Sequence, residues 1–296
     1  MAVYNYAEKF MNLLQQKYAK ELCSDALTKS NPGITFINAQ TIKLPRMAMS
    51  GYKDHTRTAG FNAGTLSNDW EPKKLEHDRD IEFFIDPMDI DETNLTLSVA
   101  NIQNTFETEQ AIPEKDSYRF SKLHSELTSY SGRVDKTVID AATLLDAFDE
   151  EMARMDEAGV PAEGRILYVT PAMNKIVKAA EGLQRVISVT TPATINRKVH
   201  SLEDVTIKHV PSARMKTQYN FTDGCVAAEN AGQINFILIH PSCVVCRDKY
   251  SYIKLFTPGT DSRTADGYLY QNRCYGDLFL LERKVAGCAM NITAGA

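Results

Sequence analysis

The chain has 296 residues, of which 43% are hydrophobic and 24% charged, a composition typical of globular proteins. Its net charge of −5 at pH 7 argues against a protein dedicated to condensing nucleic acid, for which a basic footprint is expected. The amino terminus lacks the apolar segment of a signal peptide, and no apolar run approaches the ~18 residues that span a bilayer, so we expect a soluble protein made in a cytoplasm.

The first predicted element is an amphipathic helix over residues 5–22, where apolar side chains recur at helical spacing. Two short runs with high β-propensity follow, at residues 34–38 and 41–45. A polar stretch from residue 47 to residue 80 then contains little core material, which is unusual inside a compact domain. Because strand-forming segments flank this stretch, we expect a long hairpin that leaves the body and returns through IEFFID at residues 81–86.

An acidic cluster surrounds the expected return strand, and both a metal site and helix capping have to be considered. A calcium loop of the EF-hand type that starts at Asp89 needs Gly at its sixth position and Glu at its twelfth, where the chain has Asn94 and Ala100. Apolar residues at helical spacing from Leu95 onward instead favour acids in a first helical turn, where they complement the macrodipole. We therefore interpret the cluster as capping and strand-end residues. Its members are Asp78, Asp80, Asp86, Asp89, Asp91 and Glu92.

The helix expected after residue 91 meets Pro113, which either interrupts it or starts another helix, since proline fits a first helical turn. Phe120, Leu123 and Leu127 then form an apolar stripe to about Ser129. These features predict a long helical segment with one face buried.

A second strong helix is predicted over residues 137–158. A buried strand at 165–170 follows, and Thr170 and Pro171 predict the start of a further helix that runs to Gly182. Additional strands are predicted at residues 205–211, 233–240 and 251–256. In the helix at 137–158, the expected inward stripe is Leu145, Phe148, Met152 and Met155, and the expected solvated face is Asp149, Glu150, Glu151 and Glu157.

The sequence contains none of the common nucleotide-binding, esterase, metalloprotease or kinase motifs. Its six histidines show no ligand spacing, and we expect its six cysteines to be free structural thiols. Cys243 and Cys246 lie three apart in a predicted strand, so they are expected on opposite faces. A carboxylate-dependent hydrolase that uses Asp86, Asp89 and Glu92 would need a basic or nucleophilic partner, and none is found. We therefore expect an assembly protein that is not an enzyme and has no cofactor or metal.

Several long motifs follow one another along nearly the whole chain. SGYKDHTRTAGF at residues 50–61 is similar to SGLxDYxRxxGF, and DRDIEFFIDPMDIDETN at 78–94 is similar to DRxxxFxIDxMDxDET. Further segments of the series are AIPEKDSYRFSKL, VTPAMNKIVKAA, VPSARMKTQYNF, INFILIHPSCVVCRDKY and ADGYLYQNRCYGDLFLLERK. In composition and order these motifs resemble the major capsid proteins of tailed bacteriophages with the Hong Kong 97-type fold.

The resemblance implies a structural subunit that self-assembles through pentamers and hexamers into an icosahedral-type phage head shell around double-stranded DNA. It also implies an α+β fold with a fixed division of the chain. The implied parts are an N-arm at 1–34, an extended β-hairpin (the E-loop) at 35–80, a peripheral domain with a long spine helix at 81–135, an axial domain at 136–242, and a return to the peripheral sheet at 243–296.

The expected partners are other copies of the chain, scaffolding and portal proteins, and packaged DNA through non-specific contacts on the inner face, but no membrane. The expected location is the virion capsid, after assembly in the host bacterial cytoplasm. An encapsulin-like nanocompartment shell is the alternative with the same fold, and it would need a cargo-binding groove. Charges at an interface set register, so the expected inter-subunit contacts are charged residues, namely Lys53, Arg57, Lys73, Lys74, Arg79, Asp86 and Asp89.

Overall fold

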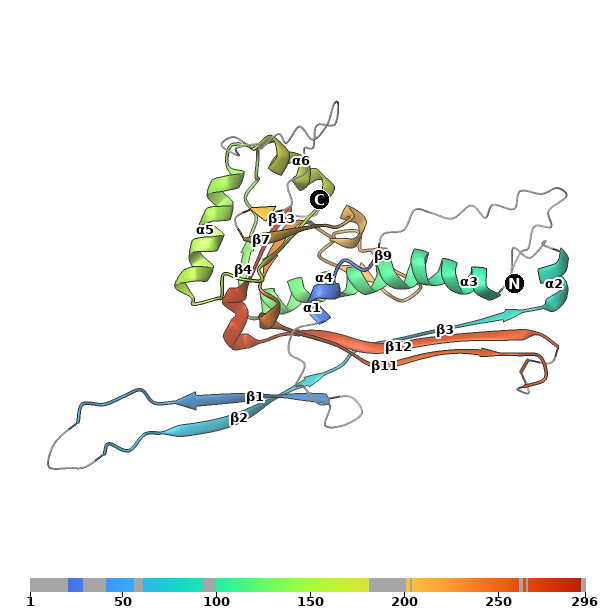
Figure 1. Cartoon of the computed structure of the whole chain (residues 1–296), viewed down its shortest axis with the longest axis horizontal. Coiled ribbons are helices and arrows are strands. Elements are labelled where there is room, and N and C mark those ends of the chain that lie inside the picture. Colours follow the sequence, from blue (N-terminus) through green and yellow to red (C-terminus); the bar gives the residue numbers. More distant parts are fainter. Residues whose placement is uncertain are drawn as a thin grey trace, which may run out of the picture.

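The computed structural model describes residues 21–28, 41–55, 61–92, 99–180, 201–202, 204–260, 263–264 and 266–293. These residues form a mixed α+β fold with an elongated body, from which one two-stranded hairpin projects (Figure 1). The helix predicted over residues 5–22 lies almost wholly outside the described residues, and the β-prone run at 34–38 lies entirely outside them.

A six-stranded mixed sheet forms the centre of the body, in the order β4-β13-β10-β5-β7-β6. Strands β5 and β10 are apolar almost throughout because both faces of the sheet are covered by helices. The strands predicted at residues 165–170, 205–211 and 233–240 are thereby confirmed. The strands of this sheet are β4 (Arg133–Asp135), β5 (Ile166–Val169), β6 (Ser201–Leu202), β7 (Val205–His209), β10 (Gln233–Ile239) and β13 (Cys288–Thr293).

Two helices, α5 (Leu144–Glu157) and α6 (Pro171–Ala179), pack on one face of this sheet. Helix α6 starts as predicted, because the Thr170 hydroxyl accepts a hydrogen bond from the Met173 backbone N–H at 3.3 Å. Helix α5 starts later than residue 137. The Asp140 carboxylate accepts hydrogen bonds from two following backbone N–H groups and holds the preceding segment as a turn.

The solvated face predicted for α5 is wrong at Glu151, which is only 5% exposed. Its carboxylate accepts hydrogen bonds from Arg133 Nε at 2.7 Å and from Arg154 Nε at 2.8 Å. Two guanidinium groups thus compensate the charge, which allows it to be buried. Its helical neighbours Asp149 and Glu150 are exposed, as predicted.

A long helical segment consists of α3 (Val99–Phe106), a π-helical segment (Glu107–Ala111) and α4 (Ile112–Ser129). Helix α4 covers the other face of the central sheet, whereas α3 extends beyond that sheet (Figure 1). Pro113 lies in the first turn of α4 and does not end the helix. The apolar stripe of α4 is confirmed, because Phe120, Leu123 and Leu127 are fully buried against the sheet.

Helix α1 (Asp25–Thr28) is held against α4 by a buried carboxylate. Asp116 is 0% exposed and accepts hydrogen bonds from the backbone N–H groups of Cys23 and Ser24, each at 3.0 Å. Arg214 Nη1 donates a further bond at 3.0 Å. These bonds join three segments that are distant in sequence.

A three-stranded antiparallel sheet runs below the long helix, in the order β11-β12-β3 (Figure 1). It comprises β3 (His77–Ile85), β11 (Val244–Phe256) and β12 (Tyr268–Leu280). The segment IEFFID therefore belongs largely to this sheet, and its prediction as the return strand of the hairpin is wrong. The actual return strand, β2 (Leu66–Lys74), is mostly polar and mostly exposed, so it lacks the hydrophobic pattern that identifies a strand from sequence.

The remaining elements are short. Strands β8 (Tyr219–Asn220) and β9 (Val226–Ala227) form a small hairpin, and 3₁₀ turns cover Ser212–Arg214, Pro241–Cys243 and Glu282–Gly287. None of the described helices combines the length and the apolar character needed to cross a membrane.

The cysteines are free thiols, as predicted, and four of the six are buried. Cys246 lies in β11, but Cys243 lies in a 3₁₀ turn instead of the predicted strand. Burial raises the pKa of Cys243 to about 12 and that of Cys246 to about 11. Both thiols therefore stay protonated and weakly reactive at neutral pH.

Candidate assembly surface

The hairpin consists of β1 (Thr41–Met49) and β2, paired in register from Thr41 opposite Lys74 to Met49 opposite Leu66. It extends away from both sheets of the body (Figure 1). An isolated two-stranded hairpin is at best marginally stable in water. This hairpin therefore depends on contacts with the body at its base, and its outer part offers a surface to other molecules.

An apolar anchor holds the base of the hairpin. Ile42 and Leu44 lie two residues apart on β1, so they share one face of the ribbon. Both are buried together with Leu75, against Val245 of β11 and Phe279 of β12. The base of the hairpin is thus packed onto the three-stranded sheet.

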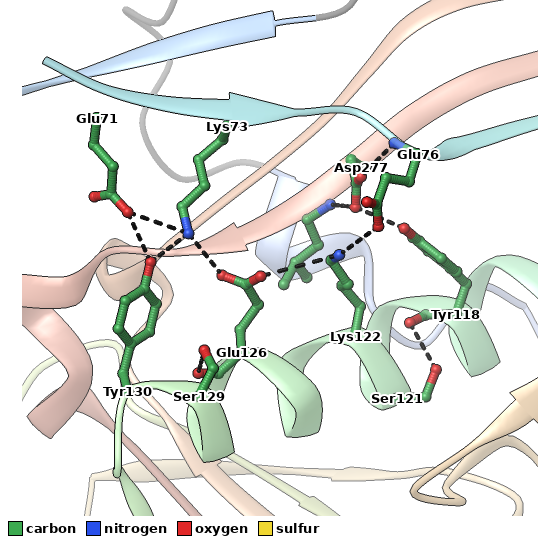
Figure 2. Close-up of polar contacts among 11 residues, drawn as sticks. Glu71, Lys73, Glu76, Tyr118, Ser121, Lys122, Glu126, Ser129, Tyr130 and Asp277 are labelled. Atoms are coloured by element: carbon green, nitrogen blue, oxygen red, sulfur yellow. Dashed lines mark hydrogen bonds and ion pairs between the residues drawn. The ribbon is translucent and has the colours of Figure 1, made fainter.

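A polar anchor on α4 adds to this packing (Figure 2). The Lys73 ammonium donates to the Tyr130 hydroxyl and lies 3.4 Å from Glu126 Oε2 and 3.2 Å from Glu71 Oε1. The Tyr130 hydroxyl donates to Glu71 at 2.9 Å. Burial alone lowers the pKa of Lys73, but the hydrogen bonds to Tyr130 and Glu71 and the charge of Glu126 outweigh this effect and raise the pKa. Lys73 therefore stays charged and joins β2 to α4.

A second group of polar residues fixes the turn between β2 and β3 (Figure 2). Asp277 accepts hydrogen bonds from the Glu76 backbone N–H at 2.9 Å and from the Tyr118 hydroxyl at 2.8 Å. Lys122 Nζ donates to the Glu76 carboxylate at 3.2 Å. Burial raises the pKa of Asp277, and these donors only partly offset that effect.

Strand β1 has polar contacts of its own. Arg46 Nη1 lies 2.7 Å from Glu282 Oε2, and the Arg283 guanidinium donates to the Met47 carbonyl. Both strands of the hairpin are thus tied to the body by charged groups.

The outer part of the ribbon exposes large apolar side chains on both strands and beyond them. Phe61 is 99% exposed, and even Trp70, which is nearer the body, is 49% exposed. Exposed apolar groups that gather on one projecting element indicate an interaction surface. We call this set the distal hairpin surface; it comprises Met47, Met49, Tyr52, Phe61, Leu66 and Trp70.

The structure places the lysines predicted as contact residues in different surroundings. Lys53 and Lys74 are exposed on the hairpin, and Lys53 Nζ donates to the Ala63 carbonyl at 3.2 Å. Lys73 belongs to the polar anchor and is mostly buried. Arg57 lies outside the described residues.

Arg79 lies on β3 and makes contacts within the chain. Its Nε donates to Glu114 Oε1 on α4 at 2.7 Å, and its guanidinium also donates to the carbonyls of Phe221 and Gly224. It therefore connects the three-stranded sheet with the long helix and the β8–β9 hairpin.

Asp86 and Asp89 lie at the far end of β3, away from the hairpin (Figure 1). Asp86 Oδ1 accepts a hydrogen bond from the Met88 backbone N–H at 2.8 Å and so caps α2 (Pro87–Glu92), and Asp89 is in its first turn. The capping interpretation is confirmed for Asp86. It is wrong for Asp91, which lies in the last turn of α2 and not in the first turn of the long helix, because the cap and Pro87 begin a separate short helix earlier.

Of the parts of the chain with described positions, none brings together three or more His, Cys, Asp or Glu side chains in a group that could hold a metal ion.

Sequence reasoning did not identify the residues on α4 and at its carboxyl-terminal cap that hold the hairpin. Tyr118, Lys122, Glu126 and Tyr130 recur every four residues, and residues four apart share one face of a helix. This row of polar residues beside the apolar stripe is visible in the sequence and could have indicated a second contact face of the helix. Asp277, the partner of Tyr118, gave none, because it lies 159 residues further along the chain.

Comparison with known proteins gives a match in structure but not in sequence. No family model and no curated protein sequence matches the chain. The mature capsid of bacteriophage PhiM1 superposes with a TM-score of 0.68 at 13% identity, covering 97% of this chain and 91% of that one. The capsid of Cyanophage P-SCSP1u gives a TM-score of 0.69 at 12% identity, with 98% and 93% covered.

A structure from Mycobacterium phage Che8 gives a TM-score of 0.65 at 14% identity, with 98% of both chains covered. The chain has the fold of phage capsid structures. The predicted α+β class and the resemblance to phage capsid proteins are thereby confirmed at the level of the fold.

Proposed function

We propose that the chain is a capsid shell subunit, a structural and non-enzymatic protein of a tailed-phage virion. In this proposal its copies form pentamers and hexamers that close into a head shell around double-stranded DNA. The observation that carries the proposal is the distal hairpin surface, presented by a projecting ribbon in a fold shared with phage capsid structures.

Physical chemistry connects this surface with assembly. Full burial of one large apolar side chain is worth about 1.5–3 kcal/mol, so a set of six is a substantial driving force that the chain does not use internally. A ribbon of one copy that covers a different surface of the next copy makes a heterologous contact, and heterologous contacts close into rings. Copies joined in this way are suited to build capsomers.

The assignment of segments to an E-loop and a peripheral domain is also part of the proposal. The hairpin would be the E-loop, and the helical segment from Val99 to Ser129 would be the spine of the peripheral domain. Lys53 and Lys74 are positioned to meet a neighbouring copy, whereas Lys73 and Arg79 would act indirectly by holding the hairpin and β3. Scaffolding and portal proteins and packaged DNA are the further partners we propose, with assembly in the host cytoplasm.

The proposal is tested by shortening the hairpin. Met47 and Asn68 are paired directly, so residues 48–67 can be replaced by Asn-Gly, the preferred two-residue hairpin turn. This change keeps every anchor described above and removes Met49, Tyr52, Phe61 and Leu66. We expect a folded protein that unfolds at the normal temperature but forms no closed shells in sedimentation velocity and negative-stain microscopy.

Val138→Ser is the control, because Val138 is 90% exposed on the body, and this variant should assemble normally. Closed particles in normal yield from the shortened chain would contradict the proposal. Particles that purify with a second protein at fixed stoichiometry would favour the encapsulin-like alternative.

A further inference from the structure

A groove of about 610 Å³ opens beside the base of the hairpin, on the face of the three-stranded sheet away from α4. Register places Tyr250, Tyr275 and Asp78 directly opposite one another on β11, β12 and β3, so they share this face. Lys74 at the end of β2 and Lys249 on β11 also line the groove. Its volume lies within the roughly 300–1,000 Å³ that is typical of ligand-binding clefts.

The groove has an excess of positive charge. Arg273 binds the Asp78 carboxylate with two hydrogen bonds, at 2.9 and 2.6 Å, and these bonds lower the pKa of Asp78. Glu76, the other acid of the groove, is paired with Lys122 at 3.2 Å. Both acids are thus paired with cations, and the lining contains three basic residues, Lys74, Lys249 and Arg273, beside these two acids.

The walls of the groove are aromatic. Lys249 Nζ lies 5.8 Å from the centre of the Tyr275 ring, and the Arg273 guanidinium lies 5.9 Å from the centre of the Tyr250 ring. Tyr250 is 46% exposed. The matching ligand therefore combines negative charge with an apolar side chain.

The end of the molecule formed by α2 combines negative charge with an exposed apolar side chain. Residues 86–92, DPMDIDE, contain four acids and no base, and they form α2 with its cap. Met88 on this helix is 65% exposed. A methionine thioether makes favourable contacts with aromatic rings, and carboxylates complement lysines.

Helix α2 and the groove lie at opposite ends of β3 (Figure 1). The strand from Asp78 to Ile85 separates them by roughly 26 Å, so α2 cannot reach the groove of its own chain. We propose that α2 of a second copy of this chain docks in the groove, with Met88 between Tyr250 and Tyr275 and Asp89 facing Lys74 and Lys249. The proposal rests on the shell function proposed above and specifies one of its contacts.

Charge reversal tests this contact in purified protein under assembly conditions. Lys74→Glu and Asp89→Lys should each raise the concentration needed for assembly roughly tenfold, because each places like charges together. The double variant should assemble at a concentration within roughly threefold of that of the unmodified protein, since the two reversed charges attract each other again. Lys254→Glu is the matched control, because Lys254 is an exposed lysine on β11 outside the groove, and it should have little effect.

A second measurement does not depend on variants. Particles assembled from equal amounts of ¹⁴N- and ¹⁵N-labelled chains are treated with a zero-length carbodiimide cross-linker and analysed by mass spectrometry. We expect mixed-isotope cross-links between Lys74 or Lys249 and an acid of residues 86–92. Closed particles without such cross-links, or with these lysines joined to a different acidic segment, would overturn the docking of α2 but leave the shell function standing. Failure of the unmodified chain to form rings or shells would overturn both.

Discussion

Strands β10 and β2 use the same kind of backbone pairing in opposite surroundings. In β10 the four residues from Phe236 to Ile239 are all buried, between β5 and β13 and under helices on both faces. In β2 the first five residues are exposed, and the strand pairs only with β1 among the described strands. The body buries most of its apolar groups, whereas the outer part of the hairpin leaves its own exposed. Under the proposed function, stability and assembly should therefore respond to different residues.

The strongest test of this contrast compares two identical substitutions. Phe120 is 0% exposed under the central sheet, so Phe120→Ala should lower the free energy of unfolding by about 3–5 kcal/mol. Phe61→Ala should change it by less than about 0.5 kcal/mol in the unassembled protein but reduce shell yield. Denaturant unfolding and sedimentation measure the two effects. A large loss of stability in Phe61→Ala would show that the hairpin belongs to the core of its own chain.

The junction between the two regions should make stability depend on pH. His77 stacks on Tyr118 with ring centres 3.7 Å apart, and burial and the Arg79 charge lower its pKa to about 4. The unfolded chain binds this proton near pH 6.5, so between pH 6.5 and 4 the unfolded state binds more protons than the folded state. Stability is therefore greatest above pH 6.5 and falls as the pH decreases, by up to about 1.4 kcal/mol per pH unit from this group.

His77→Phe keeps an aromatic ring beside Tyr118 and removes the titration. Asp277, whose pKa is raised by burial, titrates in the opposite sense but is present in both proteins. The difference between the two denaturation profiles from pH 7 to pH 4.5 thus isolates His77. A difference that does not vary with pH would exclude the buried neutral histidine.

The smallest expected effect is on the polar anchor. Lys73→Met removes the cation shared by Tyr130, Glu71 and Glu126 and should cost about 1–2 kcal/mol, with faster hydrogen exchange of the β2 amides near the base. Lys53→Met is the matched control on the same hairpin, where an exposed lysine contacts only a carbonyl among the described groups, and it should cost less than about 0.5 kcal/mol. Equal exchange rates in the two variants would argue against an anchoring role of Lys73.

Hydrophobic periodicity and capping residues predicted the elements whose formation depends on residues close together in the sequence. The stripe of Phe120, Leu123 and Leu127, the start of α6 at Thr170 and the buried run of β10 all follow from periodicity or capping. Strand β2 was missed because an exposed strand needs no apolar alternation. The burial of Glu151 was also missed, because it depends on Arg133, which only the folded structure brings near.

The candidate surface was predicted in outline. The long polar stretch indicated a projecting hairpin, and Lys73 was named as one of its charges. Its partner Tyr130 lies 57 residues further along the chain, and the contact between Glu76 and Asp277 spans 201 residues. Such contacts depend on how the sheet packs against the helix. The partners have no fixed spacing in the sequence, so a single sequence does not reveal them.

The anchoring of the hairpin at one end only gives it the mechanics of a lever. Contacts with the body hold β1 as far as the Met47 carbonyl, so the free arm begins there. The eight residues from Ala48 to His55 would give it a reach of at most roughly 27 Å, so a tilt of roughly 10° at Met47 would move its outer end by up to roughly 5 Å, about the spacing between neighbouring strands in a sheet. The contacts of Arg46 and Met47 with the body therefore set the angular precision with which the outer end can find its target.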